Sequence, residues 1–196
     1  IRLSLVGSEM CIRDRNKNKQ QVELNPELER IQTMLKALLT LVTTFLSLKY
    51  LVLDGHFGNW PSAWMVRQNN LHLISKLRHD AALYLPYDGP KPKRGPTPKF
   101  GEKIDYACLP DKYLVQSSIE DGIRTNIYQA KLWNKEFPNQ LNVVIIHKII
   151  LETQKVAHVV LFSTDLELPF DKLIEYYKLR FQIEFNFRDA KQYWGL

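Results

Sequence analysis

The sequence has little cysteine and no long uncharged apolar run, and both absences narrow the class of protein. Its two cysteines among 196 residues, Cys11 and Cys108, provide neither a disulfide framework nor the ligand spacing of a zinc site. The most apolar stretch, residues 34–53, is interrupted by Lys36 and Lys49. Its uncharged part is too short to cross a bilayer of about 30 Å. We therefore expect a reduced cytoplasmic protein without a membrane-spanning segment.

A secretion signal is not evident at the start of the chain. Residues 1–10 contain an arginine but neither a sustained apolar region nor a small-residue cleavage site. The chain begins without methionine, and residues 6–15, VGSEMCIRDR, resemble a translated sequencing adapter. We expect residues 1–15 to be a non-native segment, and the alternative is a natural terminus with little structure. The fold prediction therefore starts at Asn16.

Composition and charge indicate a folded, basic protein. Hydrophobic residues make up 45% of the chain, which is enough for a core. The formal net charge of +6 favours an anionic partner. Nucleic acid is the commonest such partner, but many basic proteins bind none, so charge alone does not decide the function.

A long helix is predicted to begin at Asn25-Pro26-Glu27. Asn25 supplies a capping side chain, Pro26 suits the first helical position, and Glu27 places an acid in the first turn. Apolar residues then recur in steps of three and four: Leu28, Ile31, Leu35, Leu38, Val42 and Phe45. This spacing predicts one buried stripe along the whole helix.

An alternation of helices and strands follows. Residues 49–53 form a short β-favouring run suited to a strand buried on both faces, and it ends at an Asp54-Gly55 turn. Residues 62–68 are predicted to form a short helix and residues 71–75 a second strand. This order predicts an α/β fold with a parallel sheet.

The character of the sequence changes at Tyr84. Prolines and basic residues alternate as far as Lys103, which indicates an exposed basic loop. Four β-rich runs come next: residues 113–119, 125–133, 141–150 and 157–163. A last helix is predicted over residues 170–193. We therefore divide the chain into a first core part (16–83), a β-rich insertion (84–163) and a C-terminal core part (164–196).

The last helix presents four reactive or charged side chains on one face. Tyr177, Arg180, Glu184 and Lys191 fall within an arc of about 60° at about 100° per residue. A carboxylate that holds a divalent ion, next to cations that fix phosphates, is what phosphoryl transfer on DNA requires. Taken alone, however, this pattern favours an ordinary solvated helix face, with Arg180 and Glu184 as an i, i+4 ion pair.

Asp54 is the second candidate for a functional residue. It follows a predicted strand, which is where functional residues of open parallel sheets gather. Gly55 and Gly58 allow a sharp turn beside it. A lone Asp-Gly pair favours a structural turn, whereas Asp54 together with Glu184 forms a plausible pair of ligands for Mg²⁺.

These residues resemble a known enzyme family. The spacing Tyr177-x2-Arg180-x3-Glu184-x6-Lys191 matches the Y-R-E-K signature of DDE transposases of the insertion sequence four type. Residues 51–55, LVLDG, resemble the strand that ends in the second acidic residue of their DDE triad. The β-rich segment resembles the insertion that these enzymes carry in an RNase H-like core. The resemblance extends over residues 22–196.

The resemblance implies a bacterial, nucleoid-associated transposase that cuts and transfers DNA strands. Asp54 and Glu184 would be catalytic and would bind two ions of Mg²⁺ or Mn²⁺, with the transposon ends and target DNA as partners. Tyr177, Arg180 and Lys191 would hold DNA phosphates, and Arg188 near the same face is a further candidate. A homodimer is implied for the intact protein.

The first aspartate of the triad is not found. Residues 16–22 supply no strand with an aspartate, so the first strands of the RNase H-like core are also missing. We therefore expect this partial chain to be inactive alone. A non-catalytic DNA-binding remnant and an RNase H-like nuclease remain as alternatives, although the β-rich insertion disfavours the nuclease.

Several other residues are predicted to be structural. His56 is expected in a surface loop, His72, His147 and His158 at packing or edge positions of strands, and Trp60 and Trp64 in the core. The basic loop that carries Lys91, Lys93 and Arg94 suits DNA contact and plain solvation equally well.

Overall fold

The computed structural model describes residues 22–42, 45–92 and 94–194, without the side chains of Glu184, Phe187 and Trp194. The elements, in chain order, are α2 (Pro26–Val42), β1 (Tyr50–Val52), the 3-10 turn η2 (Gly55–Phe57), α3 (Trp60–Gln68), β2 (His72–Lys76), β3 (Leu83–Pro86), β4 (Phe100–Lys103), the 3-10 turn η3 (Asp111–Tyr113), β5 (Leu114–Glu120), β6 (Ile123–Asn134), β7 (Leu141–Ile150), β8 (Val156–Ser163) and α4 (Phe170–Trp194). The segment predicted to be non-native, residues 1–15, lies outside the described residues.

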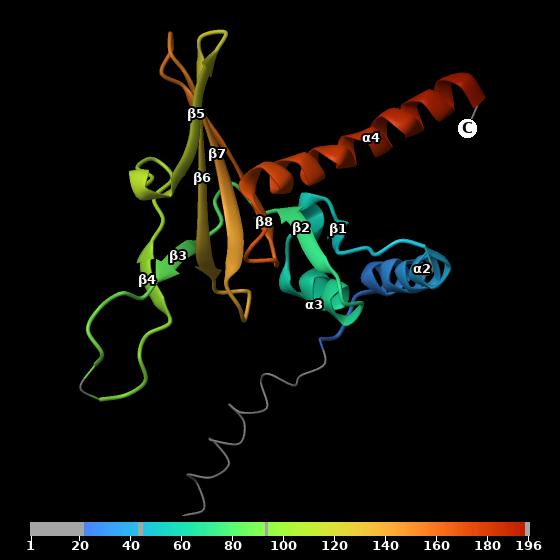
Figure 1. Ribbon diagram of the computed structural model, residues 1–196, viewed down its shortest axis with the longest axis horizontal. Coiled ribbons are helices and arrows are strands. Elements are labelled where there is room, and N and C mark those ends of the chain that lie inside the picture. Colours follow the sequence, from blue (N-terminus) through green and yellow to red (C-terminus); the bar gives the residue numbers. More distant parts are fainter. Residues whose placement is uncertain (1–21, 43–44, 93, 195–196) are drawn as a thin grey trace, which may run out of the picture.

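One mixed sheet organises the chain. Its strands run in the order β1-β2-β8-β7-β6-β3-β4, and β5 pairs with β6 (Figure 1). β1 and β2 are parallel, as predicted, while every other pair of described strands is antiparallel. The α/β class is thus confirmed. Because β2 pairs directly with β8, the segments 16–83 and 84–163 share this sheet, and their boundaries stay a prediction.

Helix α2 begins where the sequence predicted but is only partly buried. The Asn25 side chain caps it by accepting a hydrogen bond from the Leu28 N–H at 2.8 Å. Leu28 and Leu35 are buried, whereas Leu38 is 50% and Phe45 is 81% exposed. The prediction of a buried stripe through Phe45 is therefore wrong for the second half. The helix ends at Val42. Its core contacts extend from Leu28 to Leu39, while Leu38 points away from the cluster.

Strand β1 is less buried than predicted. All three of its residues are half-buried, although residues 49–53 were expected to be buried on both faces. The reason is its position at the end of the sheet, where β2 is its only neighbour among the described strands.

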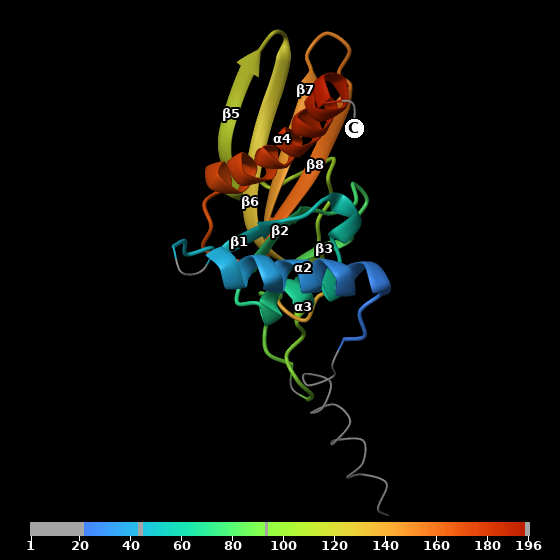
Figure 2. The same ribbon diagram turned by 90° about the vertical axis from the view of Figure 1, so that its right-hand side faces the viewer.

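Two apolar clusters lie on opposite faces of the sheet. On one face, α2 and α3 pack with Leu73, Val143, Phe162 and their neighbours. On the other face, α4 packs with Ile74, Val144 and neighbouring residues (Figure 2). Neighbouring positions of β2 and β7 contribute to opposite clusters, as the alternation of side chains along a strand requires.

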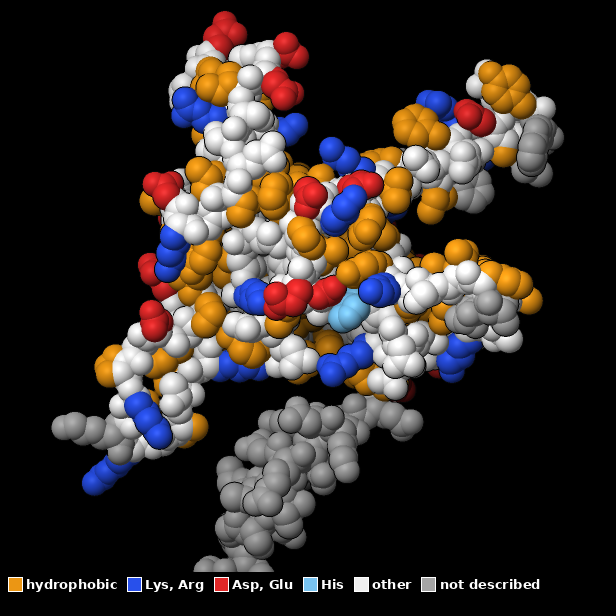
Figure 3. Space-filling view, viewed as in Figure 1, with side chains coloured by type: hydrophobic (Ala, Val, Ile, Leu, Met, Phe, Trp, Pro, Cys, Tyr) orange, Lys and Arg blue, Asp and Glu red, His pale blue; other side chains and the backbone are white. Residues whose placement is uncertain are grey.

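Helix α4 leaves the sheet part-way along its length. Leu173 and Tyr177 in its first half are buried. Its second half projects away from the sheet and exposes apolar side chains, among them Ile183 at 56% and Phe185 at 52% (Figures 1 and 3). Within the described residues, no helix is both long and apolar enough to cross a membrane.

Candidate active site

Asp54 lies shortly after β1, and hydrogen bonds to the neighbouring Gly55 and to Ser75 fix its position. It caps η2 with an extended conformation (φ −65°, ψ 164°), and its Oδ1 accepts a hydrogen bond from the Gly55 N–H at 2.7 Å. Its carbonyl accepts a hydrogen bond from the hydroxyl of Ser75, a fully buried residue of β2, at 2.8 Å. The side chain of Asp54 is 55% exposed. A fixed backbone therefore presents an accessible carboxylate.

The turn after Asp54 requires glycine at position 58. A Cβ atom added to Gly58 would lie 2.3 Å from the carbonyl oxygen of Lys76, at the end of β2. The Gly58 N–H donates to the Gly55 carbonyl at 3.1 Å and closes the turn. The absence of a side chain thus lets the turn pack against the backbone of β2 and sets the position of Asp54.

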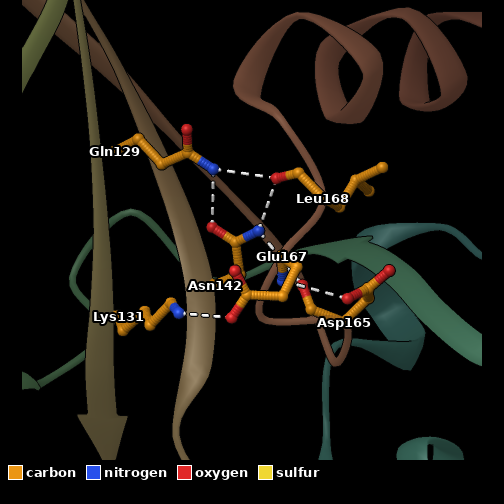
Figure 4. A network of polar contacts seen from close by, with 6 residues as sticks. All are labelled: Gln129, Lys131, Asn142, Asp165, Glu167 and Leu168. Atoms are coloured by element: carbon orange, nitrogen blue, oxygen red, sulfur yellow. Dashed lines mark hydrogen bonds and ion pairs between the residues drawn. The ribbon is translucent and has the colours of Figure 1, made fainter.

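A polar network fixes the start of α4 to the sheet (Figure 4). The buried Asn142 amide of β7 donates to the carbonyls of Leu168 at 2.7 Å and Asp165 at 3.1 Å. Gln129 of β6 donates to the Leu168 carbonyl at 2.9 Å and to the Asn142 side-chain oxygen at 2.8 Å. Lys131 adds an ion pair with Glu167. The loop between β8 and α4 is therefore tied to two central strands, which sets the direction of the helix.

Tyr50 connects β1 to the same loop. Its hydroxyl donates to Asp165 Oδ2 at 2.7 Å, and its ring lies 5.4 Å from that of Tyr176 on α4. Burial, reinforced by the hydrogen bond to Asp165, raises the pKa of Tyr50 to about 12. Burial by itself would raise the pKa of Asp165, but the Glu167 N–H and the Tyr50 hydroxyl stabilise its carboxylate and lower that pKa. These contacts hold β1 and α4 in a fixed relation.

The structure brings Arg180 of the predicted signature to Asp54. Arg180 Nη1 lies 3.5 Å from Asp54 Oδ1, and its side chain is 19% exposed. The guanidinium carbon lies 5.6 Å from the ring centre of Tyr177 and 4.6 Å from that of Phe181. Tyr177 is only 7% exposed, so it can offer DNA no more than a small part of its side chain. Its ring packs against the Arg180 guanidinium.

The remaining predicted site residues lie further along α4. Glu184 follows Arg180 by one turn, about 6 Å along the axis. Lys191 is exposed and lies 11 residues after Arg180 in α4, about 16 Å further along the helix axis. Arg188 is exposed, pairs with Asp189 at 3.7 Å and lies over the ring of Phe185. The signature thus extends outward from Asp54 and does not form one compact cluster.

Asp54 fits one part of a divalent-metal site. Its Oδ1 accepts both described contacts, and its Oδ2 has no hydrogen-bond or ion-pair partner among the described residues. Hard carboxylate oxygens of this kind are the ligands that Mg²⁺ prefers. No group of three His, Cys, Asp or Glu side chains within the described residues could enclose an ion. The described part of the chain therefore supplies one ligand.

Most residues predicted to be structural behave as expected. His56 is exposed in the turn and pairs with Glu27 at 3.3 Å. His147 is buried in β7, and Trp60 and Trp64 pack against the larger cluster. Sequence reasoning missed Lys76, whose side chain passes beside Gly55. Its position at the end of the strand parallel to β1 is the signal that could have found it, since the ends of parallel strands meet at one edge of the sheet.

Comparison with known proteins assigns the family. A sequence model of the DDE superfamily endonucleases matches residues 11–139, which include β1, Asp54 and β2 and end before α4. No curated protein and no solved structure matches the chain. Enzymes of this superfamily act on DNA and generally use divalent metal ions, and the mixed sheet is consistent with their RNase H-like fold. The chain therefore belongs to the DDE superfamily of endonucleases, a class of nucleases and transposases.

Proposed function

We propose that the chain is the catalytic part of an insertion-sequence transposase of the Y-R-E-K type, which cleaves DNA and transfers its strands. The contact between Asp54 and Arg180 carries this proposal. These two residues are 126 positions apart, and the predicted triad aspartate and the predicted signature helix nevertheless lie side by side. An ordinary solvated helix face gives no reason for such a meeting.

Asp54 and Glu184 are proposed as the metal ligands. When bound, two Mg²⁺ or Mn²⁺ ions would activate the attacking oxygen and stabilise the leaving oxygen of a phosphodiester. Asp54 offers its Oδ2 for this purpose. Glu184 follows Arg180 by four residues, so the helix places its backbone one turn further along the same face.

The cations of α4 are proposed to hold the DNA. Arg180, next to Asp54, would fix the phosphate at the reacting position, and Lys191 and Arg188 on the projecting half would contact phosphates further along the strand. Such contacts position DNA without reading its sequence. Tyr177 would support Arg180 and contribute its exposed edge. In the intact protein we expect two copies to act together on two element ends at the bacterial nucleoid.

The competing function is DNA binding without catalysis. It is favoured by the sequence, since residues 16–22 supply no strand with an aspartate that could complete a triad. We therefore expect the chain by itself to bind DNA but not to cleave it. Cleavage of element-end DNA by the purified chain in Mg²⁺ or Mn²⁺ would contradict this expectation.

Iron-directed cleavage of the protein backbone tests the metal site directly. Fe²⁺ occupies Mg²⁺ sites, and with ascorbate and peroxide it produces radicals that cut the nearest peptide bonds. We expect cuts near residues 54 and 184, suppressed by excess Mg²⁺ and absent in Asp54→Asn and Glu184→Gln. Asp189→Asn, which removes an exposed carboxylate of the same helix, is the matched control and should keep both cuts. A pattern unchanged in Asp54→Asn would reject the site.

A further inference from the structure

A second feature of the Asp54 region is a pocket beside the turn that follows Asp54. It has a volume of about 410 Å³ and lies between the C-terminal end of β2, the segment after it, and β8. Asp54 forms one wall, and the other polar lining residues are His56, Lys76, Arg78, His79 and His158. Asp54 thus lines the pocket and also contacts Arg180 of α4.

We propose that this pocket binds a backbone phosphate of DNA next to the phosphate held at Asp54, with Lys76 and Arg78 as its anion-binding groups. The proposal rests on DNA being the substrate, as proposed above. It assigns two positioning residues that lie outside the signature helix and come from a different strand.

The charges around the pocket favour an anion. Lys76 has no ion-pair partner among the described residues. Arg78 contacts Asp80 at 3.2 Å, but its side chain is 83% exposed, so this pair is weak and its guanidinium can reorient. The single carboxylate of the lining, Asp54, is already in contact with Arg180. The pocket therefore has an excess of positive charge before any histidine is protonated.

The position of Lys76 links the pocket to the aspartate. A Cβ atom added to Gly55 would lie 3.4 Å from Lys76 Cε, so the lysine side chain runs along the turn that carries Asp54. The backbone of Lys76 is fixed by its pairing with Leu161 of β8 and by the close approach of Gly58. A phosphate bound by Lys76 would therefore lie beside the Asp54 carboxylate.

Two rings hold the segment that carries Arg78 in place. His158 of β8 donates from Nε2 to the His79 carbonyl at 2.7 Å. Its ring stacks on that of Tyr106 at 4.5 Å with an interplanar angle of 10°. The Tyr106 hydroxyl in turn donates to the Ala81 carbonyl at 2.7 Å, and burial raises its pKa to about 12. Residues 78–81 are thereby fixed at two carbonyls, which gives the pocket a preformed wall.

The size and lining of the pocket also suit a phosphate with its sugar. Sites for small ligands measure about 300–1,000 Å³. The lining is polar and cationic where it meets Asp54 and apolar only at Leu77, Val159 and Val160. Contacts of lysine and arginine to phosphate are independent of base sequence, so any duplex can serve as the probe.

Salt-dependent DNA binding provides the test. The full 196-residue chain and its variants Lys76→Gln and Arg78→Gln are titrated with a short duplex at several salt concentrations. Loss of one phosphate contact should weaken binding roughly eightfold near 0.1 M salt and lower the slope of log Kd against log salt by about 0.9. Lys155→Gln, which removes an exposed lysine from the turn between β7 and β8, is the control and should change neither value.

A neutral-phosphate scan then assigns the contact. Single methylphosphonates are placed in turn along the duplex, with the other phosphates unchanged. We expect one position to weaken binding by the wild-type chain but not by Lys76→Gln, since the variant lacks that contact already. Equal affinities and slopes for Lys76→Gln, Arg78→Gln and Lys155→Gln would overturn the pocket and leave DNA binding intact. Absence of wild-type binding at low salt would instead overturn the proposed function. Competition by inorganic phosphate without any effect of these variants on DNA binding would also reject the pocket.

Discussion

The two faces of the sheet are covered very differently. Eighteen buried residues of the described chain form the cluster beneath α2 and α3, whereas six form the cluster beneath α4. On the first face, called the thickly covered face below, the covering residues come from several elements. On the second, thinly covered face they come from the first half of one helix, and the second half of that helix stands away from the sheet (Figure 1).

We propose that this difference separates stability from function. The thickly covered face contains most of the core, while Arg180 and Asp54 meet where the thinly covered face ends. A helix held only by its first turns can present its outer part to a long polyanion. The network around Asn142 then becomes important, because it fixes the loop before α4 and adds to the small apolar cluster that holds the start of the helix.

Truncation of one buried side chain on each face should give the largest and most unequal effects. Phe162→Ala on the thickly covered face should lower the free energy of unfolding by about 3–5 kcal/mol. Leu173→Ala on the thinly covered face should lower the free energy of unfolding by about 2 kcal/mol, since α4 can shift to fill the space. Both residues are fully buried. Urea denaturation followed by circular dichroism measures both, and Ile183→Ala on the exposed half of α4 should change the value by less than about 0.5 kcal/mol. Equal losses for Phe162→Ala and Leu173→Ala would show that the faces do not differ.

The second largest loss of unfolding free energy is expected for a methyl group added at position 58. In Gly58→Ala the added Cβ would overlap the Lys76 carbonyl, so η2 must move away from β2. We expect a loss of about 1–3 kcal/mol in unfolding free energy, together with loss of iron-directed cleavage at residue 54. Gly55→Ala is the matched control, because its Cβ would make only an ordinary contact with Lys76, and its effect should stay below about 0.5 kcal/mol. Retention of the cut near residue 54 in Gly58→Ala would contradict this role of the turn.

The thickly covered face also contains a buried histidine that should make the free energy of unfolding depend on pH. Burial, with a smaller contribution from His158, lowers the pKa of His147, and neither of its ring nitrogens has a hydrogen-bond partner in the described structure. The unfolded chain therefore takes up this proton first, at a pKa of about 6.5. Above that pH the histidine should not lower the free energy of unfolding. As the pH drops below it, the free energy of unfolding should fall by at most about 1.4 kcal/mol per pH unit. Denaturation curves between pH 8 and 5 should show a smaller decline for His147→Gln, and parallel profiles would exclude the effect.

The sequence predicted helices, strands and turns better than it predicted which of their residues are buried beneath other elements. The capped start of α2, the turn at Asp54 and the four β-rich runs follow from short-range patterns and are confirmed. The burial of Phe45 and of β1 was predicted wrongly, because periodicity shows which side of an element is apolar but not whether another element covers it. The approach of Arg180 to Asp54 depends on side-chain contacts of Asn142 and Tyr50 that no spacing rule contains. The family resemblance predicted Asp54 and Glu184 as metal ligands and Arg180 as a phosphate contact, but it did not predict the contact between Arg180 and Asp54.

The contact between Asp54 and Arg180 should contribute the least to stability, although it lies at the centre of the site. The Asp54 side chain is 55% exposed and the contact is 3.5 Å long, so solvent screens it. A double-mutant cycle with Asp54→Asn and Arg180→Gln should therefore give a coupling energy below about 1 kcal/mol. DNA binding should respond more strongly, since Arg180→Gln is expected to lower the salt slope by about 0.9, as Lys191→Gln would on the projecting half. A large coupling energy with unchanged DNA binding would mean that the pair is a structural clamp, and the thinly covered face would then contribute to stability and not to function.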